Sequence, residues 1–599
     1  MIFIFAAFAV VEYLIYFSGN SHFFQGDTIY YFYLRHSTIG DFLLSFLKLD
    51  PAGWYRPLAA RTIQSLFYPV FGLEPGGYRV VQYVAFMSAM VATYMLASIV
   101  TRRRLAAIAA TLFFGVHTVN AYTTYDVAFA PEVIYTFFYV CAVATYLRYR
   151  ESNQRRFFLI SIAFFLASLF SKEAAVTLPV MLVTLDLILN RPRLRDAFAA
   201  VRIHAVILFI YLGLVWGYLG VQRAAFQSIV KRPGPEIPYR FALDRTILDN
   251  ADYALTWTFN LPRGWQTESR HLAGRRLTFL KLFRAAVVIL GLALCLRIFV
   301  VNQQGPKAQV FRPDRLILAA AAWFFIAVGP ALPLFEHFMP HYLFLPLAGF
   351  SIAIGAIADA VYRKIAAYST AAAAMAVGVP LIVLAGICAV AARNDARDNR
   401  TLGLSSRLAF NSLTDLKAQH PTLQPDTTIY FSDAGEPDLA WDLSQGQLFK
   451  MAYNDDTIRT LYWGWGEVIT KGVLQRGPLI VMKYDQFHVR DVTNDFLAAS
   501  APPVGYQHRP EYKLDITPAV AQPGEKYSLS IAGLGNGDVT LHYTLNGKPV
   551  QAFTAHLDDR SQASFEISDR TEKGVYKFVG FQKPGSADWI QAAASIRIN

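Results

Sequence analysis

About eleven apolar segments lie before residue 392, and the roughly 200 residues that follow contain none. Segments such as 78–100, 201–221 and 367–391 are long enough to cross about 30 Å of hydrocarbon, because a helix rises about 1.5 Å per residue. Mean hydropathy over the 599 residues is +0.31, which is typical of a membrane protein with a water-soluble appendage. The chain is therefore predicted to be a polytopic α-helical membrane protein whose C-terminal third is soluble.

The orientation of these segments follows from the short basic connections between them. The predicted spans cover residues 2–17, 79–100, 105–118, 130–147, 157–171, 174–190, 201–221, 281–301, 315–335, 341–360 and 367–391. Basic side chains gather around residues 102–104, 148–156, 191–202, 307–315 and 363–364. The positive-inside rule makes these connections cytoplasmic. The loops 18–78 and 222–280 and everything after 392 are then extracytoplasmic, as expected for a multi-pass protein of the bacterial inner membrane.

Charge and cysteine content exclude several classes of function. The formal net charge of +12 comes largely from these basic connections, so no nucleic-acid partner is predicted. The three cysteines, Cys141, Cys295 and Cys388, all lie in predicted spans. We therefore expect neither a disulfide framework nor a thiolate metal site in the exported part.

Two exported domains are expected after a membrane domain of residues 1–391. Residues 392–505 are predicted to form a helical neck and a small α/β module, because apolar runs at 428–431 and 479–482 flank a helix near 438–452. Residues 506–599 alternate apolar and polar side chains between frequent turns, and Asn546-Gly547 marks a hairpin. About seven such strands predict an immunoglobulin-like β-sandwich, a fold that by itself assigns no chemistry.

Ionisable residues at the outer ends of spans are candidate site residues, because charge is costly to hold there. Asp27, just after the first span, can act as a general base toward an acceptor hydroxyl or as a metal ligand; the alternative is a helix cap. Arg56 offers a planar fork for a phosphate, and its neighbour Tyr55 can stack on a sugar. The alternative for this pair is an aromatic-belt loop at the membrane surface.

Three further clusters are predicted on the same outer face. Asp126 and Glu132 lie near the head of one span. Lys172 and Glu173 lie between two spans, either as a mutually neutralising pair or as a phosphate clamp with its orienting carboxylate. His341 belongs to the third cluster. Asp27 is the candidate catalytic residue, and the other residues are candidates for binding substrate.

The third cluster also raises the question of a metal ion. Glu336, His337 and His341 lie within six residues, and such side chains can ligate a divalent ion. Pro340 separates the two histidines and breaks the helical face on which they would meet. We therefore expect that no cofactor is required, with a divalent metal as the less favoured possibility.

Short motifs in a fixed order resemble the C-type glycosyltransferases. The motifs are Asp27 after the first span, Tyr55-Arg56-Pro57-Leu58, the run 71–78, the turn 114–117, Ser171-Lys172-Glu173 and the run 341–347. Residues 1–391 are similar to protein O-mannosyltransferases and lipid A aminoarabinose transferases. They are most similar to the transmembrane mannosyltransferases that usually carry tetratricopeptide repeats.

This resemblance implies a transferase that uses a polyprenyl-phosphate-linked sugar on the outer face and needs no nucleotide. Asp27 corresponds to the acidic residue held to be the catalytic base of the family, and Arg56 and Lys172 correspond to positions near the lipid phosphate. The sequence departs from the family pattern at Tyr122, where glutamate is usual, and at His341, where arginine is usual. No tetratricopeptide repeats follow. These departures leave the sugar and the acceptor open.

Three functions fit these features. The first is an inverting glycosyltransferase that moves a sugar from polyprenyl phosphate to a hydroxyl of a glycan, lipid or protein, with the lipid tail held in the bilayer. The second is a membrane polymerase or ligase that transfers whole lipid-linked glycans. The third is a non-enzymatic glycan transporter with exported binding domains. Transporters tend to have internal repeats and spans broken at mid-membrane. The charged clusters of this chain lie at span ends, which favours an enzyme.

Overall fold

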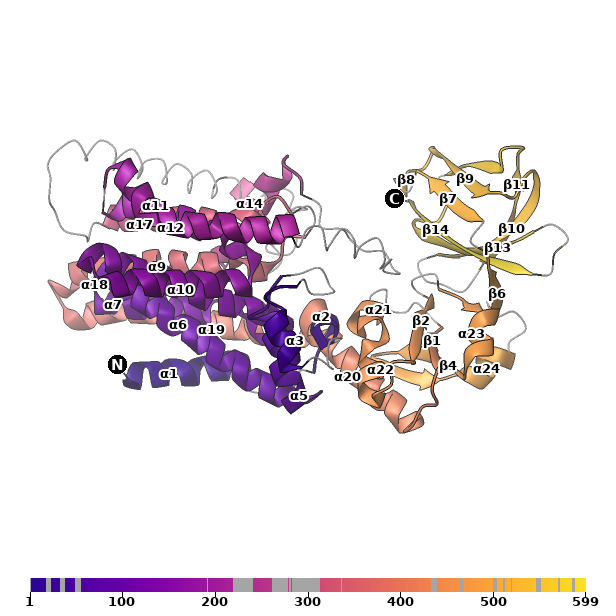
Figure 1. The fold of residues 1–599 in the computed structure, drawn as a ribbon, viewed down its shortest axis with the longest axis horizontal. Helices are drawn as coiled ribbons and strands as arrows, with labels where there is room; N and C mark the ends of the chain where they lie inside the picture. Colours follow the sequence, from indigo (N-terminus) through magenta and orange to yellow (C-terminus); the bar gives the residue numbers. More distant parts are fainter. Residues whose placement is uncertain are drawn as a thin grey trace. The chain divides into compact units, whose positions relative to one another are not determined.

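In the computed structural model the chain forms two compact units (Figure 1). The first comprises Met1–His22 and Leu34–Gly403, and the second comprises Phe23–Tyr33 and Leu404–Asn599. The structure describes all residues except 1, 18–22, 33–37, 49–54, 191, 219–240, 261–277, 280–281, 283–312, 335–336, 433–438, 464–466, 499–503, 510–511, 519, 546–550, 569–570, 584–585, 587 and 599. The predicted span 281–301 (apart from Leu282), Cys295, Glu336 and the Asn546-Gly547 turn lie outside the described residues.

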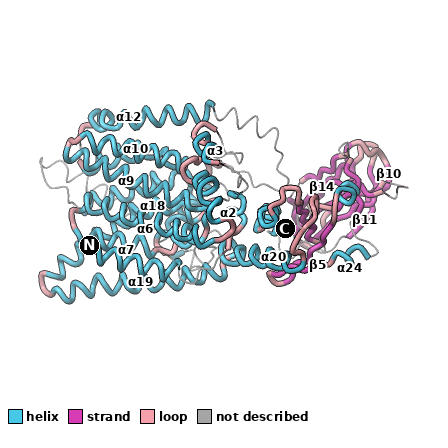
Figure 2. The backbone as a smooth tube through the Cα atoms, turned by 60° about the horizontal axis from the view of Figure 1, so that its bottom comes forward, coloured by secondary structure: helices cyan, strands magenta, loops and turns pink. Residues whose placement is uncertain are grey.

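The first unit, here called the membrane unit, is a bundle of long helices (Figure 2). Its main helices are α1 (Ile2–Glu12) continued by η1 (Tyr13–Phe17), α6 (Pro75–Thr101), α7 (Arg104–Val116), α9 (Ala130–Ser152), α10 (Arg155–Ser171), α11 (Leu178–Leu189), α12 (Leu194–Leu212), α17 (Pro313–Val328), α18 (Phe344–Ala366) and α19 (Thr370–Asp398). Helix α9 packs between α6 and α10, and α18 packs against α7 and α17 (Figure 1).

Among the residues that the structure describes, five helical stretches are long and apolar enough to cross a membrane. They are Pro75–Thr101, Val127–Ser152, Leu194–Val215, Pro340–Ala366 and Thr370–Asn394. Three shorter apolar helices accompany them, Phe3–Phe17, Arg104–Val116 and Arg315–Ala331. The helical membrane architecture is therefore confirmed. The number of eleven spans stays a prediction.

Local sequence sets where these helices begin and end. Pro75 and Pro131 lie in the first turns of α6 and α9, where a missing backbone N–H costs nothing. Arg102 and Asn153 follow the last turns of the same helices with φ of 53°, the left-handed conformation that ends a helix. Helix α9 has 23 residues, so at 1.5 Å per residue its ends lie about 34 Å apart. Its first and last turns therefore mark the two ends of the bundle.

Ion pairs gather the predicted basic connections at the end of the bundle where α9 finishes. Arg102 contacts Glu151, which also pairs with Arg148 at 3.1 Å. Arg150 Nε lies 3.0 Å from Oδ1 of Asp186, a fully buried carboxylate near the end of α11. These contacts place residues 102–104, residues 148–151 and the end of α11 together, as the charge pattern predicts.

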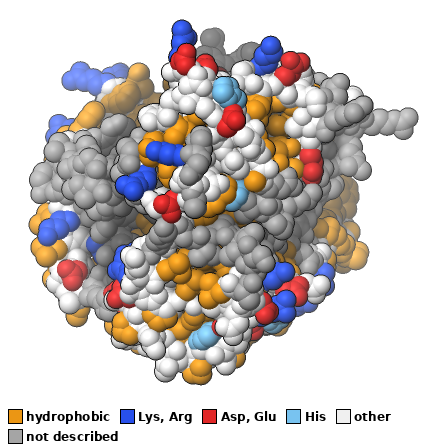
Figure 3. Space-filling view, turned by 90° about the vertical axis from the view of Figure 1, so that its right-hand side faces the viewer, with side chains coloured by type: hydrophobic (Ala, Val, Ile, Leu, Met, Phe, Trp, Pro, Cys, Tyr) orange, Lys and Arg blue, Asp and Glu red, His pale blue; other side chains and the backbone are white. Residues whose placement is uncertain are grey.

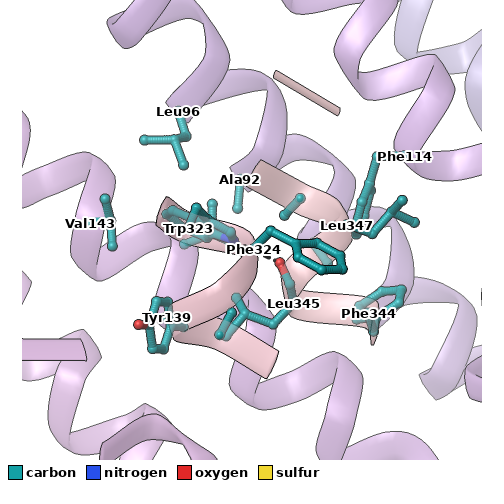
Figure 4. Packing of buried hydrophobic residues seen from close by; sticks show 14 of the residues in the cluster. Ala92, Leu96, Phe114, Tyr139, Val143, Trp323, Phe324, Phe344, Leu345 and Leu347 are labelled. Atoms are coloured by element: carbon teal, nitrogen blue, oxygen red, sulfur yellow. Dashed lines mark hydrogen bonds between the residues drawn. The ribbon is translucent and has the colours of Figure 1, made fainter. Parts of the chain in front are cut away.

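The core of the membrane unit is built from large aromatic side chains and close helix contacts. Trp323 of α17 is buried, and its Nε1 donates a hydrogen bond to the Leu345 carbonyl at 2.8 Å (Figure 4). A Cβ added to Gly349 would lie 2.2 Å from the Trp323 ring. A Cβ added to Gly355 would lie 2.1 Å from the carbonyl oxygen of Ala106. Glycine at these positions lets α18 approach both neighbours at interior packing density.

The second unit, here called the C-terminal unit, begins with α20 (Ser405–Gln419) and a four-stranded sheet. The sheet has the order β2-β1-β4-β5, formed by β1 (Thr428–Phe431), β2 (Arg459–Tyr462), β4 (Leu479–Asp485) and β5 (His488–Asp491). Strand β1 pairs in parallel with β2 and β4. Parallel neighbours need a crossover connection, and α21 (Leu439–Asp442), η10 (Ser444–Gly446) and α22 (Gln447–Tyr453) lie between β1 and β2. The sheet contains both apolar runs predicted as strands.

Two further sheets share a core after residue 512. One runs in the order β11-β10-β13-β14, with β11 (Gln551–Leu557), β10 (Gly537–Leu545), β13 (Gly574–Gln582) and β14 (Trp589–Ile598), and continues to β6 (Val504–His508) and β3 (Ile469–Thr470). The other has the order β12-β9-β7, with β12 (Gln562–Glu566), β9 (Lys526–Ala532) and β7 (Lys513–Thr517). Leu529, Leu541 and Phe581 lie in their common core. The immunoglobulin-like topology stays a prediction.

The face seen in Figure 3 carries charged side chains of both signs among scattered apolar patches. This mixture is typical of protein surface in contact with water.

Candidate functional site

A buried ion pair lies at the end of the membrane unit where α9 begins. Glu132 belongs to the first turn of α9, and Lys172 follows the last residue of α10. The Lys172 Nζ donates to Glu132 Oε1, and the two side chains are 8% and 3% exposed. Burial, with the positive charge of Arg56 as the second cause, lowers the pKa of Lys172 to about 7. Lys172 therefore carries its positive charge below about pH 7 and loses it as the pH rises above that value.

Aromatic rings and a histidine enclose this pair. The Lys172 Nζ lies 5.7 Å from the centre of the Tyr135 ring and 5.1 Å from that of Tyr342, distances at which a ring face attracts a cation. The His341 ring stacks on Phe129 at 4.2 Å, and its Nε2 lies 3.8 Å from Glu132 Oε1. Three separate segments thus meet around one ammonium group.

Two buried polar atoms of this cluster have no hydrogen-bond partner among the residues that the structure describes. They are Oε2 of Glu132 and Nδ1 of His341. Buried polar atoms in proteins are nearly always paired with protein, water or ligand. The cluster can therefore accept a polar ligand without breaking its internal bonds.

Arg56 and Glu173 form a second ion pair, linked to the first by the Lys172-Glu173 sequence. The guanidinium of Arg56 donates to both carboxylate oxygens of Glu173, with Nε 2.9 Å from Oε2. The Arg56 side chain is 15% exposed and that of Glu173 is 57% exposed. The Leu58 amide donates to the Phe170 carbonyl at 3.0 Å and fixes this loop to the end of α10. Two cations are thereby brought to one end of the bundle.

Tyr55 packs beneath the loop that carries Arg56, in the interior of the membrane unit. It is buried, and its hydroxyl donates to the Phe46 carbonyl at 2.7 Å. Its ring lies 6.2 Å from that of Phe170 and 6.0 Å from that of Tyr211. These contacts position the neighbouring Arg56, and stacking of the Tyr55 ring on a sugar stays a prediction.

Asp126 has a structural contact of its own. Its carboxylate accepts a hydrogen bond from the Ala128 amide at 3.0 Å and so caps η4 (Val127–Phe129), the turn before α9. Its carbonyl accepts from the Gln82 amide group at 2.8 Å. Asp126 is buried. These bonds set the start of α9 and therefore the position of Glu132.

Asp27 belongs to the C-terminal unit, although it comes from the first predicted outer loop. It lies in the first turn of α2 (Gly26–Tyr31), whose N-cap residue is Gln25 and has no side-chain capping bond. Asp27 is therefore not the N-cap residue of this helix. A carboxylate in a first turn is favoured by the positive end of the helix dipole.

Some polar residues of the bundle interior were not predicted. Glu12 of α1 is fully buried, and neither of its carboxylate oxygens has a hydrogen-bond partner among the described residues. A Cβ on Gly115 would lie 2.3 Å from its Oε1. Glu12 is the only ionisable residue of the first predicted span apart from two tyrosines, a signal that sequence reasoning had available. Phe129, which stacks on His341, was not predicted either, because an apolar residue in a predicted membrane segment does not stand out in the sequence.

One comparison by sequence finds a similarity between part of the membrane unit and a known family. Residues 55–216 match the family model described as dolichyl-phosphate-mannose-protein mannosyltransferase. This segment contains Arg56, Glu132, Lys172 and Glu173, whereas Asp27 lies before it. The match confirms the resemblance to C-type glycosyltransferases over this part of the chain. No curated protein matches the chain.

Several solved membrane transferases are similar to the chain in structure. ArnT from Cupriavidus metallidurans, bound to undecaprenyl phosphate, is 14% identical with a TM-score of 0.43, covering 83% of this chain and 94% of that one. The Archaeoglobus fulgidus oligosaccharyltransferase in complex with zinc and sulfate is 10% identical with a TM-score of 0.44, covering 99% and 98%. Archaeal AglB from Archaeoglobus fulgidus, in complex with an inhibitory peptide and dolichol-phosphate, is 10% identical with a TM-score of 0.41, covering 100% and 97%.

Proposed function

We propose that this chain is an integral-membrane glycosyltransferase that moves a sugar from a polyprenyl-phosphate donor to an acceptor hydroxyl on the outer face of the inner membrane. The observation that carries the proposal is the buried cluster of Lys172, Glu132 and His341 beside the Arg56–Glu173 pair. All but His341 lie in the segment that matches the mannosyltransferase family. Cations, carboxylates and aromatic rings held together at the end of a helix bundle suit a lipid-linked sugar phosphate.

The two cations would bind the donor phosphate. The Arg56 fork suits two phosphate oxygens, and the Lys172 ammonium acts as a point charge. Without donor, Glu173 and Glu132 neutralise these cations, which lowers the cost of holding charge at the membrane surface. The unpaired Nδ1 of His341 can add a third contact. In this proposal neither a metal nor a nucleotide is required, because Arg56 and Lys172 supply the cationic contacts to the phosphate.

The transfer itself would use Asp27 as the general base. The acceptor oxygen attacks the anomeric carbon while Asp27 takes the hydroxyl proton, so a new C–O bond forms with inversion. The bond between that carbon and the phosphate oxygen breaks, and the polyprenyl phosphate leaves with its electron pair. Positive charge on Arg56 and Lys172 would lower the energy of this departure, because it would offset the charge that develops on the leaving phosphate. General-base assistance typically contributes about 10²–10⁴-fold.

The decisive experiment supplies the purified full chain with radiolabelled undecaprenyl-phosphate sugars, tested one at a time with a mixture of glycan and peptide acceptors. We expect transfer from at least one donor, and weaker donor binding in Arg56→Ala. Arg245→Ala is the matched control, since Arg245 is exposed and pairs only with Asp249 four residues on among the ion pairs of the described residues. Binding without any transfer would favour the transporter. Transfer only from lipid-linked oligosaccharides would favour the polymerase or ligase.

A further inference from the structure

A short segment of the first outer loop is buried in the C-terminal unit. The segment Phe23–Tyr33 groups with Leu404–Asn599, although about 370 residues separate the two in sequence. Within it Phe24, Ile29 and Phe32 are buried. Helix α2, which carries Asp27, packs against α21, η10 and α22 of the α/β module. The segment is therefore part of the core of this unit and not a loop on its surface.

A buried hydrogen bond ties the start of the segment to α20. The Ser406 Oγ donates to the Phe23 carbonyl at 2.8 Å, and Ser406 is buried. The Phe23 ring also packs on Phe410 of the same helix, with ring centres 5.6 Å apart. Next to Ser406, the Ser405 hydroxyl donates to Asp442 and joins α20 to α21. One end of the segment is thus held by a helix that is itself fixed to the module.

A close backbone contact next to Asp27 also fixes the segment to the C-terminal unit. A Cβ added to Gly26 would lie 2.1 Å from the carbonyl oxygen of Trp441 and 2.9 Å from its carbonyl carbon. Glycine is therefore the residue that allows α2 to lie against the backbone of α21. Any side chain at this position would push the first turn of α2, and with it Asp27, away from the module.

From these contacts we infer that the C-terminal unit positions the general base, with Ser406 and the Trp441 carbonyl as its positioning groups. This inference rests on the proposed function, in which Asp27 is that base. A helix of six residues is not stable alone, so its position comes from what it packs against. A base must lie within hydrogen-bond reach of the proton it takes, and a shift of about 1 Å can cost about 100-fold in rate. The exported part is then a component of the catalytic machinery and not an appendage.

The test combines hydrogen exchange with kinetics in the full-length purified chain. The Ile29 amide donates to the Gln25 carbonyl at 3.0 Å and reports on whether α2 is formed and docked. In Ser406→Ala we expect this amide to exchange about fivefold faster, as follows from losing one buried hydrogen bond. With the undecaprenyl-phosphate sugar that supports turnover, kcat should fall while KM for the donor stays unchanged.

Ser412→Ala is the matched control. Ser412 lies on the same helix and is equally buried, but its hydroxyl has no hydrogen-bond partner among the described residues. We expect wild-type exchange at Ile29 and wild-type kcat. A control that behaves like Ser406→Ala would show a general effect of shortening side chains on α20, and would overturn the assignment of Ser406.

Gly26→Ala provides a second, stronger perturbation. We expect faster exchange at Ile29 than in Ser406→Ala and a fall in kcat approaching 100-fold. Gly76→Ala is its control, because a Cβ there meets nothing within 4 Å. Unchanged exchange in both Ser406→Ala and Gly26→Ala would overturn the inference. Faster exchange with wild-type kcat would also overturn it, since the segment would then move without consequence for the reaction.

The exchange measurement separates this inference from the proposed function. If no donor supports turnover, the proposed function fails, and the exchange rates still decide whether the C-terminal unit holds α2. If turnover occurs but Asp27→Asn retains it, the base is another residue, while the anchoring of α2 is judged by exchange alone.

Discussion

Replacing Lys172 with methionine shows whether the buried Lys172–Glu132 pair binds a ligand or only stabilises the fold. The side chains of Lys172 and Glu132 are 8% and 3% exposed, so the Lys172→Met substitution removes the partner of a buried carboxylate. Breaking such a pair from one side costs about 3–5 kcal/mol, because the remaining charge is left uncompensated. Replacing both partners with neutral groups of similar size, as in Lys172→Met with Glu132→Gln, is often close to neutral for stability.

The two readouts are thermal unfolding in detergent and binding of an undecaprenyl-phosphate sugar. We expect the single variant to lose stability and donor binding, and the double variant to regain stability without regaining binding. This split follows because stability depends on cancelling charge, whereas binding depends on the cation itself. If the double variant bound donor as well as the wild type, Lys172 would be a structural partner of Glu132, and the phosphate clamp would be refuted.

Three further results are expected. Donor binding should weaken as pH rises through about 7, because the lowered pKa of Lys172 removes its charge above that value, and Lys172→Arg should flatten this profile in a binding titration. Gly355→Ala should lower the thermal unfolding temperature of the membrane unit, since its Cβ would lie 2.1 Å from a backbone carbonyl of α7. Gly378→Ala should leave that temperature unchanged, because its Cβ meets nothing within 4 Å. A reporter fused after Arg104 should be cytoplasmic and one after Asn411 exported, and an exported Arg104 fusion would refute the orientation.

Sequence patterns of short range predicted most of the helices and strands. The apolar run before Arg102 becomes α6, and the alternating run after Gly537 becomes β10, because length, hydropathy and alternation act locally. The basic connections around residues 102–104 and 148–156 were predicted to share one face, and Arg102 and Arg150 do lie in ion pairs at one end of the bundle. These features need no knowledge of distant parts of the chain.

The site could be predicted only in part, because its partners are distant in sequence. Lys172 was a candidate, but no local feature of the sequence predicts that Glu132 pairs with it or that the Tyr342 ring faces it. The docking of Gly26 on Trp441 depends on a backbone contact across more than 400 residues, which leaves no local pattern. The cap that Asp126 forms on η4 could not be predicted either, because an exposed-loop carboxylate and a buried cap have the same sequence signal.

The most direct test of the account is the turnover of Asp27→Asn measured beside its affinity for the undecaprenyl-phosphate sugar. Asparagine keeps the size and hydrogen-bonding shape of aspartate but cannot take a proton at neutral pH. We expect donor affinity close to that of the wild type and turnover lower by about 10²–10⁴-fold, the usual range for general-base assistance. Turnover within about twofold of the wild type would contradict this expectation, because Asp27 could then not be the general base.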